Sequence, residues 1–249
     1  MLEFRGNVLC VGFGAVARCA LPILVKHVRV PPGNITILDF DDSAGLAAQE
    51  WGARGCKLVK DRVTQENLAT LLGQHVGRGD LLIDLAWNID CCELLAWCHA
   101  RGVLYVNTSV EVWDPYLNAD GMHPTEKTLY WRHMNVRRLK ASWSEPGPTA
   151  VLEHGANPGL ISHWTKQGLI DVGKAVLDER RVTGEKADRI RDAIKSRKFN
   201  ALARQLGVKV IHCSERDTQI SNQPKQVNEF VNTWSVEGFR EEGTTTAEV

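Results

Sequence analysis

The sequence has no excess of charge of either sign. Thirty Lys and Arg residues balance thirty Asp and Glu residues, so the formal net charge is zero at pH 7. Without a basic field to attract polyanions, we expect no nucleic-acid partner and no membrane partner. Uncharged apolar runs also fall short of the roughly 18 residues that a membrane-spanning helix needs. The content of 43% hydrophobic and 24% charged residues is typical of an ordinary soluble globular protein.

The cysteines lack the pattern of a metal site or of a disulfide framework. There are seven of them, an odd number, and no C-x-x-C pair indicates zinc. They lie within apolar segments, as Cys10 does between Leu9 and Val11. The opening residues MLEFRG also lack the basic-then-apolar order of a signal peptide. We therefore expect no metal, reduced thiols and a cytoplasmic location.

The sequence does contain an apolar run that leads into a glycine turn. Residues 8–11 are predicted to form a buried strand, and the pattern G-x-G-x-x-A follows at Gly12, Gly14 and Ala17 before a helix. A dinucleotide site requires this order of strand, turn and helix. Gly12 permits the tight turn, Gly14 lets the backbone approach a pyrophosphate, and Ala17 lets the helix pack on the strand. The alternative is an ordinary strand-loop-helix with a glycine turn.

The predicted cofactor site extends from the helix to a second strand. Ala15 and Val16 open the helix, whose unpaired N–H groups and partial positive charge suit phosphates. The strand predicted at 35–39 ends in Asp39, which follows the fingerprint by 39 − 17 = 22 residues. An Asp at this place accepts from both ribose hydroxyls, and no Arg follows it at 40–42 to bind a 2′-phosphate. We therefore predict NAD in preference to NADP.

Strands alternate with helices over the first 160 residues. Apolar runs at 80–86 and 103–106 are predicted strands, and helical patterns at 64–74 and 90–101 separate them from their neighbours. This alternation predicts an α/β fold with a doubly wound, parallel, Rossmann-type sheet. We expect residues 1–160 to form a dinucleotide-binding domain.

The composition shifts toward mixed charges after this domain. We expect residues 161–249 to begin an α+β substrate domain, with strands at 208–212 and 232–236. Two strands give too little surface to close a sheet, and no closing helix or strand is evident after them. We therefore expect this α+β domain to be incomplete and truncated in this chain.

Four further stretches are not required by a generic dinucleotide fold. They are NTSVEVW at 107–113, GANPG at 155–159, HCSERDTQ at 212–219 and NTWSVEGF at 232–239. Together with the glycine turn, and in the same order, they resemble bacterial homospermidine synthase, a relative of the saccharopine dehydrogenase group. Members of that family are considerably longer, so the chain resembles their N-terminal part.

The resemblance implies an enzyme whose NAD is reduced and reoxidised within one cycle. Putrescine would lose a hydride and become an imine, a second putrescine amine would attack that carbon, and ammonia would leave. Reduction of the new imine would give homospermidine. The implied partners are small diamines, putrescine and also spermidine, and the full-length family member is expected to be a homodimer.

A diamine carries two ammonium groups, so its pocket calls for carboxylates and aromatic faces. Glu111 follows a strand at the carboxyl end of the sheet, where open α/β proteins bind ligands. It can accept a proton or pair with an iminium, or it can simply cap a loop. Asn157 can hold an amine through its side-chain oxygen, although Asn before Pro is also a common turn former.

The later motifs supply the remaining candidates. A surface ion pair would explain Glu215 without any function, but the resemblance favours a role for it. Trp234 can stack a cationic amine on its indole, a contact worth about 0.5 to 2 kcal/mol, although a lone Trp in a strand more often belongs to a core. The resemblance assigns the functional glutamate to Glu242, with Glu237 in support. The predicted catalytic set is Glu111, Asn157, Glu215, Trp234, Glu237 and Glu242.

Two other functions fit the sequence. A related dehydrogenase of the saccharopine or carboxynorspermidine type would join an amine to a substrate that carries carboxylates. Such a pocket calls for several Arg residues, whereas acids follow Trp234 in this sequence. A non-catalytic NAD-binding fragment is the third interpretation, and measured turnover with diamines would separate it from an enzyme.

Overall fold

The structure is a computed structural model, and it describes residues 1–41, 45–117, 121–216, 218, 220 and 223–246. Contacts divide the chain into two units. The first unit comprises residues 1–153 and 219–249, and the second comprises residues 154–218. No helix in the described part of the chain is both long and apolar enough to cross a membrane.

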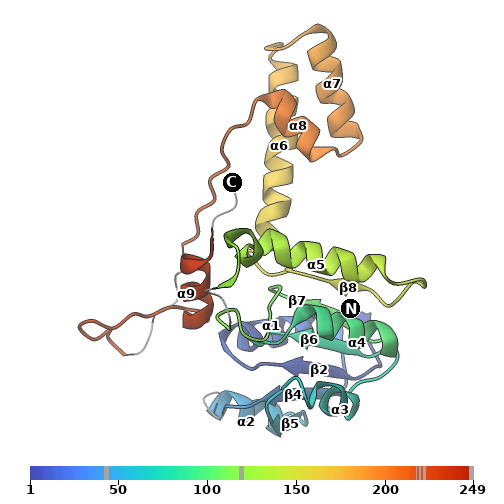
Figure 1. Ribbon diagram of the computed structural model, residues 1–249, viewed down its shortest axis with the longest axis vertical. Helices are drawn as coiled ribbons and strands as arrows, with labels where there is room; N and C mark the ends of the chain where they lie inside the picture. Colours follow the sequence, from blue (N-terminus) through green and yellow to red (C-terminus); the bar gives the residue numbers. More distant parts are fainter. Residues whose placement is uncertain (42–44, 118–120, 217, 219, 221–222, 247–249) are drawn as a thin grey trace. The chain divides into compact units, whose positions relative to one another are not determined.

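A six-stranded sheet forms the centre of the first unit (Figure 1). Its strands are β2 (Val8–Val11), β4 (Ile35–Asp39), β5 (Lys57–Lys60), β6 (Leu81–Asp84), β7 (Leu104–Asn107) and β8 (Ala150–Val151). Their order across the sheet is β5, β4, β2, β6, β7 and β8, and every neighbouring pair is parallel. The strand order reverses at β2, which is the doubly wound topology. The predicted Rossmann-type sheet is therefore confirmed. A separate parallel pair joins β1 (Leu2–Glu3) to β3 (Val28–Arg29).

Helices cover both faces of this sheet because side chains of the central strand alternate between the faces. Val8 and Cys10 of β2 pack with residues of α1 and α2, whereas Leu9 and Val11 pack with residues of α3 and α4. All of β2 is buried, as expected for a strand covered on both sides. The helices of this unit are α1 (Ala15–His27), α2 (Gly45–Ala53), α3 (Leu68–Gly73), α4 (Cys91–Arg101), α5 (Leu129–Ala141) and α9 (Val236–Thr244), with short 3-10 turns at Pro32–Asn34 and Pro124–Lys127.

The second unit contains three packed helices. They are α6 (Leu160–Asp178), α7 (Gly184–Lys195) and α8 (Phe199–Leu206), and Figure 1 shows α7 and α8 lying beside α6. Ile190 and Leu202 are fully buried between them. A Cβ at Gly173 of α6 would approach the Ile194 side chain to 3.0 Å, so glycine allows this close packing.

The prediction of two strands after residue 207 is wrong. Residues 208–212 are irregular and almost entirely exposed, and within the described residues neither 208–212 nor 232–236 pairs with another strand. Val236 instead begins α9, because the Ser235 hydroxyl accepts a hydrogen bond from the Gly238 backbone N–H at 3.0 Å and caps the helix. The expected α+β character is therefore not found: the described residues after 160 form helices and irregular segments. The expectation of no closing helix is wrong as well.

Residues 219–249 return to the first unit in the grouping by contacts. The expected functional division into 1–160 and 161–249 differs from this grouping, since α9 packs against the sheet-bearing unit through its residue Glu241. The functional division stays a prediction.

Candidate functional site

The glycine turn after β2 is shaped by close backbone approach. Gly12 has a φ of +86°, and a Cβ placed on it would lie 2.8 Å from the Leu85 carbonyl oxygen. Its N–H donates to the Leu38 carbonyl at 2.9 Å, which ties the turn to β4. A Cβ on Gly14, in contrast, would meet nothing within 4 Å. The protein therefore requires glycine at position 12 for its own packing, whereas at position 14 the glycine leaves space for a ligand.

Helix α1 starts at the turn with its N-terminal groups available. Gly14 is its N-cap and offers no side-chain hydrogen bond, and the first turn contains no acid. Ala15 and Val16 form that first turn, while Ala17 is fully buried against the sheet. Such a helix start suits the phosphates of a dinucleotide.

Asp39 connects the end of β4 to the same turn. One carboxylate oxygen accepts a hydrogen bond from the Phe13 backbone N–H, and the other accepts from the Asp41 backbone N–H at 2.9 Å. These bonds hold the carboxylate at the carboxyl edge of the sheet. Residue 42, part of the stretch without Arg, lies outside the described residues.

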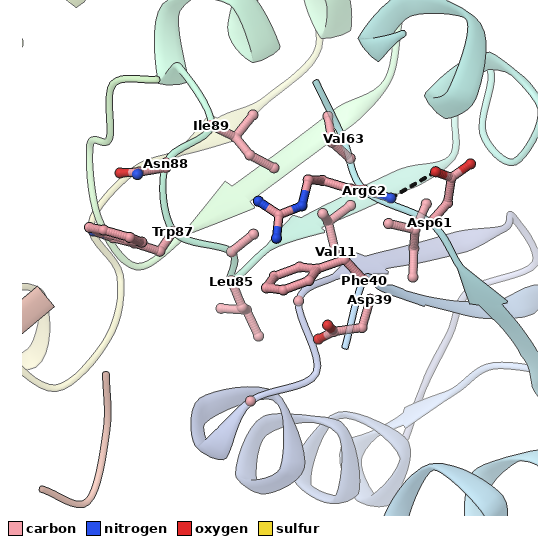
Figure 2. Close-up of a pocket in the computed structure, with 14 residues that line it drawn as sticks. Val11, Asp39, Phe40, Asp61, Arg62, Val63, Leu85, Trp87, Asn88 and Ile89 are labelled. Atoms are coloured by element: carbon pink, nitrogen blue, oxygen red, sulfur yellow. Dashed lines mark hydrogen bonds between the residues drawn. The ribbon is translucent and has the colours of Figure 1, made fainter. Parts of the chain in front are cut away.

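A cavity of about 370 Å³ opens beside this carboxylate (Figure 2). Gly12, Gly14 and Asp39 line it, as do Phe40 and Arg62. The Arg62 guanidinium carbon lies 3.9 Å from the centre of the Phe40 ring. The sequence prediction missed Arg62, because it follows a different strand and no local motif marks it.

A second cavity, of about 580 Å³, joins the helix start to the segment before α9. Gly14, Ala15 and Val16 line one part of it, and residues 231–235 line another. Trp234 belongs to this lining and is 38% exposed. The structure thus brings the predicted cation-binding indole to the predicted cofactor turn.

Glu111 lies after β7 with a buried carboxylate. The Ser109 hydroxyl donates to its Oε1 at 2.6 Å, whereas its Oε2 is buried and has no hydrogen-bond partner among the described residues. Burial raises the pKa of Glu111, and the nearby acids Glu241 and Glu242 raise it further, while Ser109 and Arg132 oppose them. A buried acceptor without a partner is costly, so the arrangement favours a cationic or hydrogen-bond-donating ligand at Oε2.

Glu241 is the buried acid of α9, and the catalytic role predicted for its neighbour Glu242 stays a prediction. It forms an ion pair with Arg132 of α5 and accepts from the Trp87 indole N–H at 3.3 Å. Arg132 also donates to the Val110 carbonyl at 3.1 Å, next to Glu111. Glu242 is exposed. The two acids are neighbours in the sequence, and the rotation of α9 about its axis decides which of them faces inward.

A buried polar network lies under this edge. Tyr105 donates to Asp84 at 2.8 Å, Asn107 donates to the Tyr105 hydroxyl at 3.0 Å, and the Asn107 oxygen accepts from the Glu153 N–H at 2.9 Å. Burial raises the pKa of Asp84 to about 7, although the Tyr105 hydrogen bond opposes the shift. The sequence prediction did not identify this network.

The remaining predicted residues are exposed. Asn157 lies in a turn between the bridged Gly155 and Gly159, and Glu215 lies in an irregular segment. Both belong to the second unit, so their catalytic roles stay predictions. Glu237 occupies the first turn of α9 and lies 3.9 Å from Arg240. Two residues of the 212–219 motif, at 217 and 219, lie outside the described residues.

Known proteins match this chain over nearly its whole length. The family described as the saccharopine dehydrogenase NADP binding domain matches residues 8–151. Homospermidine synthases of Blastochloris viridis and Mesorhizobium japonicum are each 33% identical, over 98% and 99% of this chain and 49% of their own length. The crystal structure of the homospermidine synthase of Legionella pneumophila in complex with NAD is 29% identical, with a TM-score of 0.74, over 95% of this chain and 46% of that one. The chain thus spans about half the length of the relatives it matches.

Proposed function

The chain belongs to the saccharopine dehydrogenase NADP-binding domain family, and from this premise we propose that it is the cofactor-binding part of an NAD-dependent homospermidine synthase. One observation carries the proposal: the glycine turn and Trp234 line the same cavity. A redox cofactor and a cation-binding aromatic face are the two components that diamine oxidation needs in one place.

The proposed reaction follows the resemblance. Putrescine is oxidised to an imine, a second putrescine amine attacks it with loss of ammonia, and the product imine is reduced to homospermidine. NAD, when bound, supplies the hydride acceptor and the hydride donor. Gly12, Gly14, Ala15 and Val16 would hold its pyrophosphate, and Asp39 would accept from the adenosine ribose.

Glu111 is proposed to hold an ammonium group or take a proton at Oε2. That oxygen is buried and lacks a hydrogen-bond partner among the described residues. Burial raises the pKa of the Glu111 carboxyl above its ordinary value, which makes its carboxylate a stronger base for proton transfer. A bound cation would lower this pKa again, because an opposite charge favours the carboxylate. Glu111 can therefore bind a cationic amine and accept its proton.

The other proposed contacts place negative charge and an aromatic face around the amine. Trp234 would stack on the cation, and Glu237 and Glu242 of α9 would add negative charge around it. Asn157 and Glu215 are proposed to contact the diamine on the strength of the resemblance. Spermidine as a further substrate, a homodimer of the full-length protein and a cytoplasmic location belong to the same proposal; the seven cysteines, which are all unpaired, support the last.

A saccharopine-type condensation is the second candidate. Arg18 lines the cavity that contains Trp234, and a guanidinium suits a substrate carboxylate. Against it, Arg132 is already paired with Glu241. Comparing putrescine with saccharopine as ligands separates the two candidates.

Calorimetric titration tests the proposed function directly. We expect the chain to bind NAD, and the NAD-saturated chain to bind putrescine in preference to saccharopine. Glu111→Gln should weaken putrescine binding by about tenfold or more, since a charged hydrogen bond is lost. Glu93→Gln is the matched control, because the Glu93 carboxylate of α4 accepts a hydrogen bond from Gln65 at 3.0 Å and lines neither cavity. NAD binding without any Glu111-dependent diamine binding would contradict the proposal.

A further inference from the structure

A positively charged side chain, that of Arg62, lines the cavity beside Asp39. The sequence predicted no Arg at this site. The cavity beside Asp39 is lined by both Phe40 and Arg62, and Figure 2 shows the Arg62 side chain extending across the Phe40 ring. The guanidinium carbon is 3.9 Å from the ring centre. This contact holds a planar charged group at the adenosine end of the proposed dinucleotide site.

The sheet register explains how Arg62 reaches this place. Asp39 of β4 lies opposite Lys60 of β5, so the residues that follow each strand emerge side by side at the carboxyl edge. Phe40 comes one residue after Asp39, and Arg62 comes two residues after Lys60. No Arg follows Asp39 directly in the sequence, but Arg62, which follows the neighbouring strand β5, lies beside it in the fold.

Asp39 and Arg62 carry opposite charges and line the same cavity, but among the described residues they form no ion pair with each other. Asp39 uses its two oxygens to accept from the Phe13 and Asp41 backbone N–H groups. Among the residues that the structure describes, no carboxylate forms an ion pair with Arg62. Asp61 also lines the cavity, but its carboxylate accepts from the Arg62 backbone N–H at 2.8 Å. The donors of the guanidinium therefore remain available to a ligand.

We infer that Arg62, held by Phe40, is a binding site for a phosphate on the 2′ position of the adenosine ribose. Asp39 opposes that phosphate by its charge, and Arg62 attracts it, so the balance of the two residues sets the choice between NAD and NADP. A stacked guanidinium is pre-oriented for phosphate recognition. This inference rests on the proposed binding of a dinucleotide and adds the residue that would bind the 2′-phosphate.

Calorimetric titrations with NAD and NADP test the inference without any measurement of turnover. The variants are Asp39→Asn, Arg62→Gln and the double variant. Asp39→Asn removes the repulsion, and we expect NADP affinity relative to NAD to rise by about tenfold or more. Adding Arg62→Gln should reverse most of that rise, and NADP binding by Asp39→Asn should also weaken more steeply with salt than binding by the double variant.

Arg54→Gln is the matched control. Arg54 lies over the Trp51 ring with its guanidinium carbon 5.0 Å from the ring centre, and it does not line the cavity. It should leave the affinities for both cofactors unchanged. Arg62→Gln alone should lower NADP affinity relative to NAD by about threefold to tenfold, so the test survives even if Asp39→Asn folds poorly.

The outcomes separate this inference from the proposed function. The protein could bind NAD tightly while Arg62→Gln leaves the ratio of NADP affinity to NAD affinity unchanged, both in the parent and in Asp39→Asn. That result would overturn the role of Arg62 and leave the proposed function standing. Failure of the parent chain to bind either dinucleotide overturns both the proposed function and this inference. If Arg62→Gln changes the ratio of NADP affinity to NAD affinity and Arg54→Gln does not, the result supports Arg62 as the 2′-phosphate site.

Discussion

The two halves of the sheet end in different kinds of site. In the half formed by β2 and β4, the site is built from backbone: Gly12 approaches Leu85, Gly14 faces open space, and Asp39 is held by N–H groups. In the half formed by β6 and β7, it is built from buried titratable side chains, chiefly Asp84 and Glu111. The first half therefore provides a backbone surface on which a cofactor can lie, and the second provides carboxyl groups that can bind cations and exchange protons.

This difference determines which substitutions should damage each half of the sheet. A site made of backbone is damaged by a single added carbon, because the surrounding atoms cannot give way. A site made of charged side chains tolerates volume-conserving changes but responds to the charge it loses and to pH.

The largest effect is expected at Gly12. Gly12→Ala puts a Cβ 2.8 Å from the Leu85 oxygen and 2.9 Å from the Ala86 nitrogen at a φ of +86°. We expect a loss of about 4 kcal/mol in unfolding free energy, with roughly 1 to 2 from the backbone conformation and roughly 1 to 3 from overpacking. Urea denaturation measures it.

Gly14→Ala is the matched control on the same turn. Its added carbon meets nothing within 4 Å, so the unfolding free energy should change by less than about 1 kcal/mol. NAD affinity should still fall by about tenfold, because the carbon occupies the approach of the pyrophosphate. Equal losses of stability in the two variants would contradict the backbone-built interpretation.

The fold and the cofactor turn could be predicted because their signals are local. Residues 8–11 form one apolar run, and the glycines that follow report backbone geometry directly. Arg62 could not be found in this way, because its position depends on the register between two strands. The segment at 232–236 misled the prediction, since β-branched residues make a strand only where a partner strand exists, and the Ser235 cap starts a helix there instead.

The second prediction concerns the pH dependence that the β6–β7 half gives to stability. The buried Asp84 keeps its proton up to a pKa of about 7, whereas an unfolded Asp releases it near pH 4. Between these values the folded state binds more protons, so this contribution to stability falls as pH rises. It should fall by about 2 to 3 kcal/mol from pH 5 to pH 8.

Asp84→Asn is neutral throughout and should lack that contribution. The stability of the parent relative to the variant should therefore be greater at pH 5 than at pH 8. Urea denaturation of both proteins at the two pH values measures the difference. Parallel pH profiles for parent and variant would show that Asp84 does not hold the extra proton.

A smaller effect is expected where α9 covers the charged half. Glu241→Gln keeps the shape of the side chain but weakens its bonds to Arg132 and Trp87, so stability should fall by about 1 to 2 kcal/mol. Glu237→Gln on the same helix is the control, because its ion pair with Arg240 is exposed and 3.9 Å long. That change should cost less than about 0.5 kcal/mol. Equal costs would remove the distinction between the inner and outer acids of α9.

The smallest effect is expected at Trp234, which lines a cavity together with the backbone-built turn and is proposed to bind the cation. Trp234→Phe keeps an aromatic ring with a weaker quadrupole, and Trp234→Leu removes the ring. If the indole holds a cation, putrescine affinity of the NAD-saturated protein should fall in the order Trp, Phe, Leu, by about 1 kcal/mol or roughly fivefold in total. If the indole only packs, melting temperature should fall while the affinity of the folded protein stays constant. Trp234 is 38% exposed, and titration beside thermal melting separates the two roles. If the Leu variant binds putrescine as tightly as the parent, Trp234 does not bind the cation. The diamine would then be bound by the carboxylates of the β6–β7 half alone.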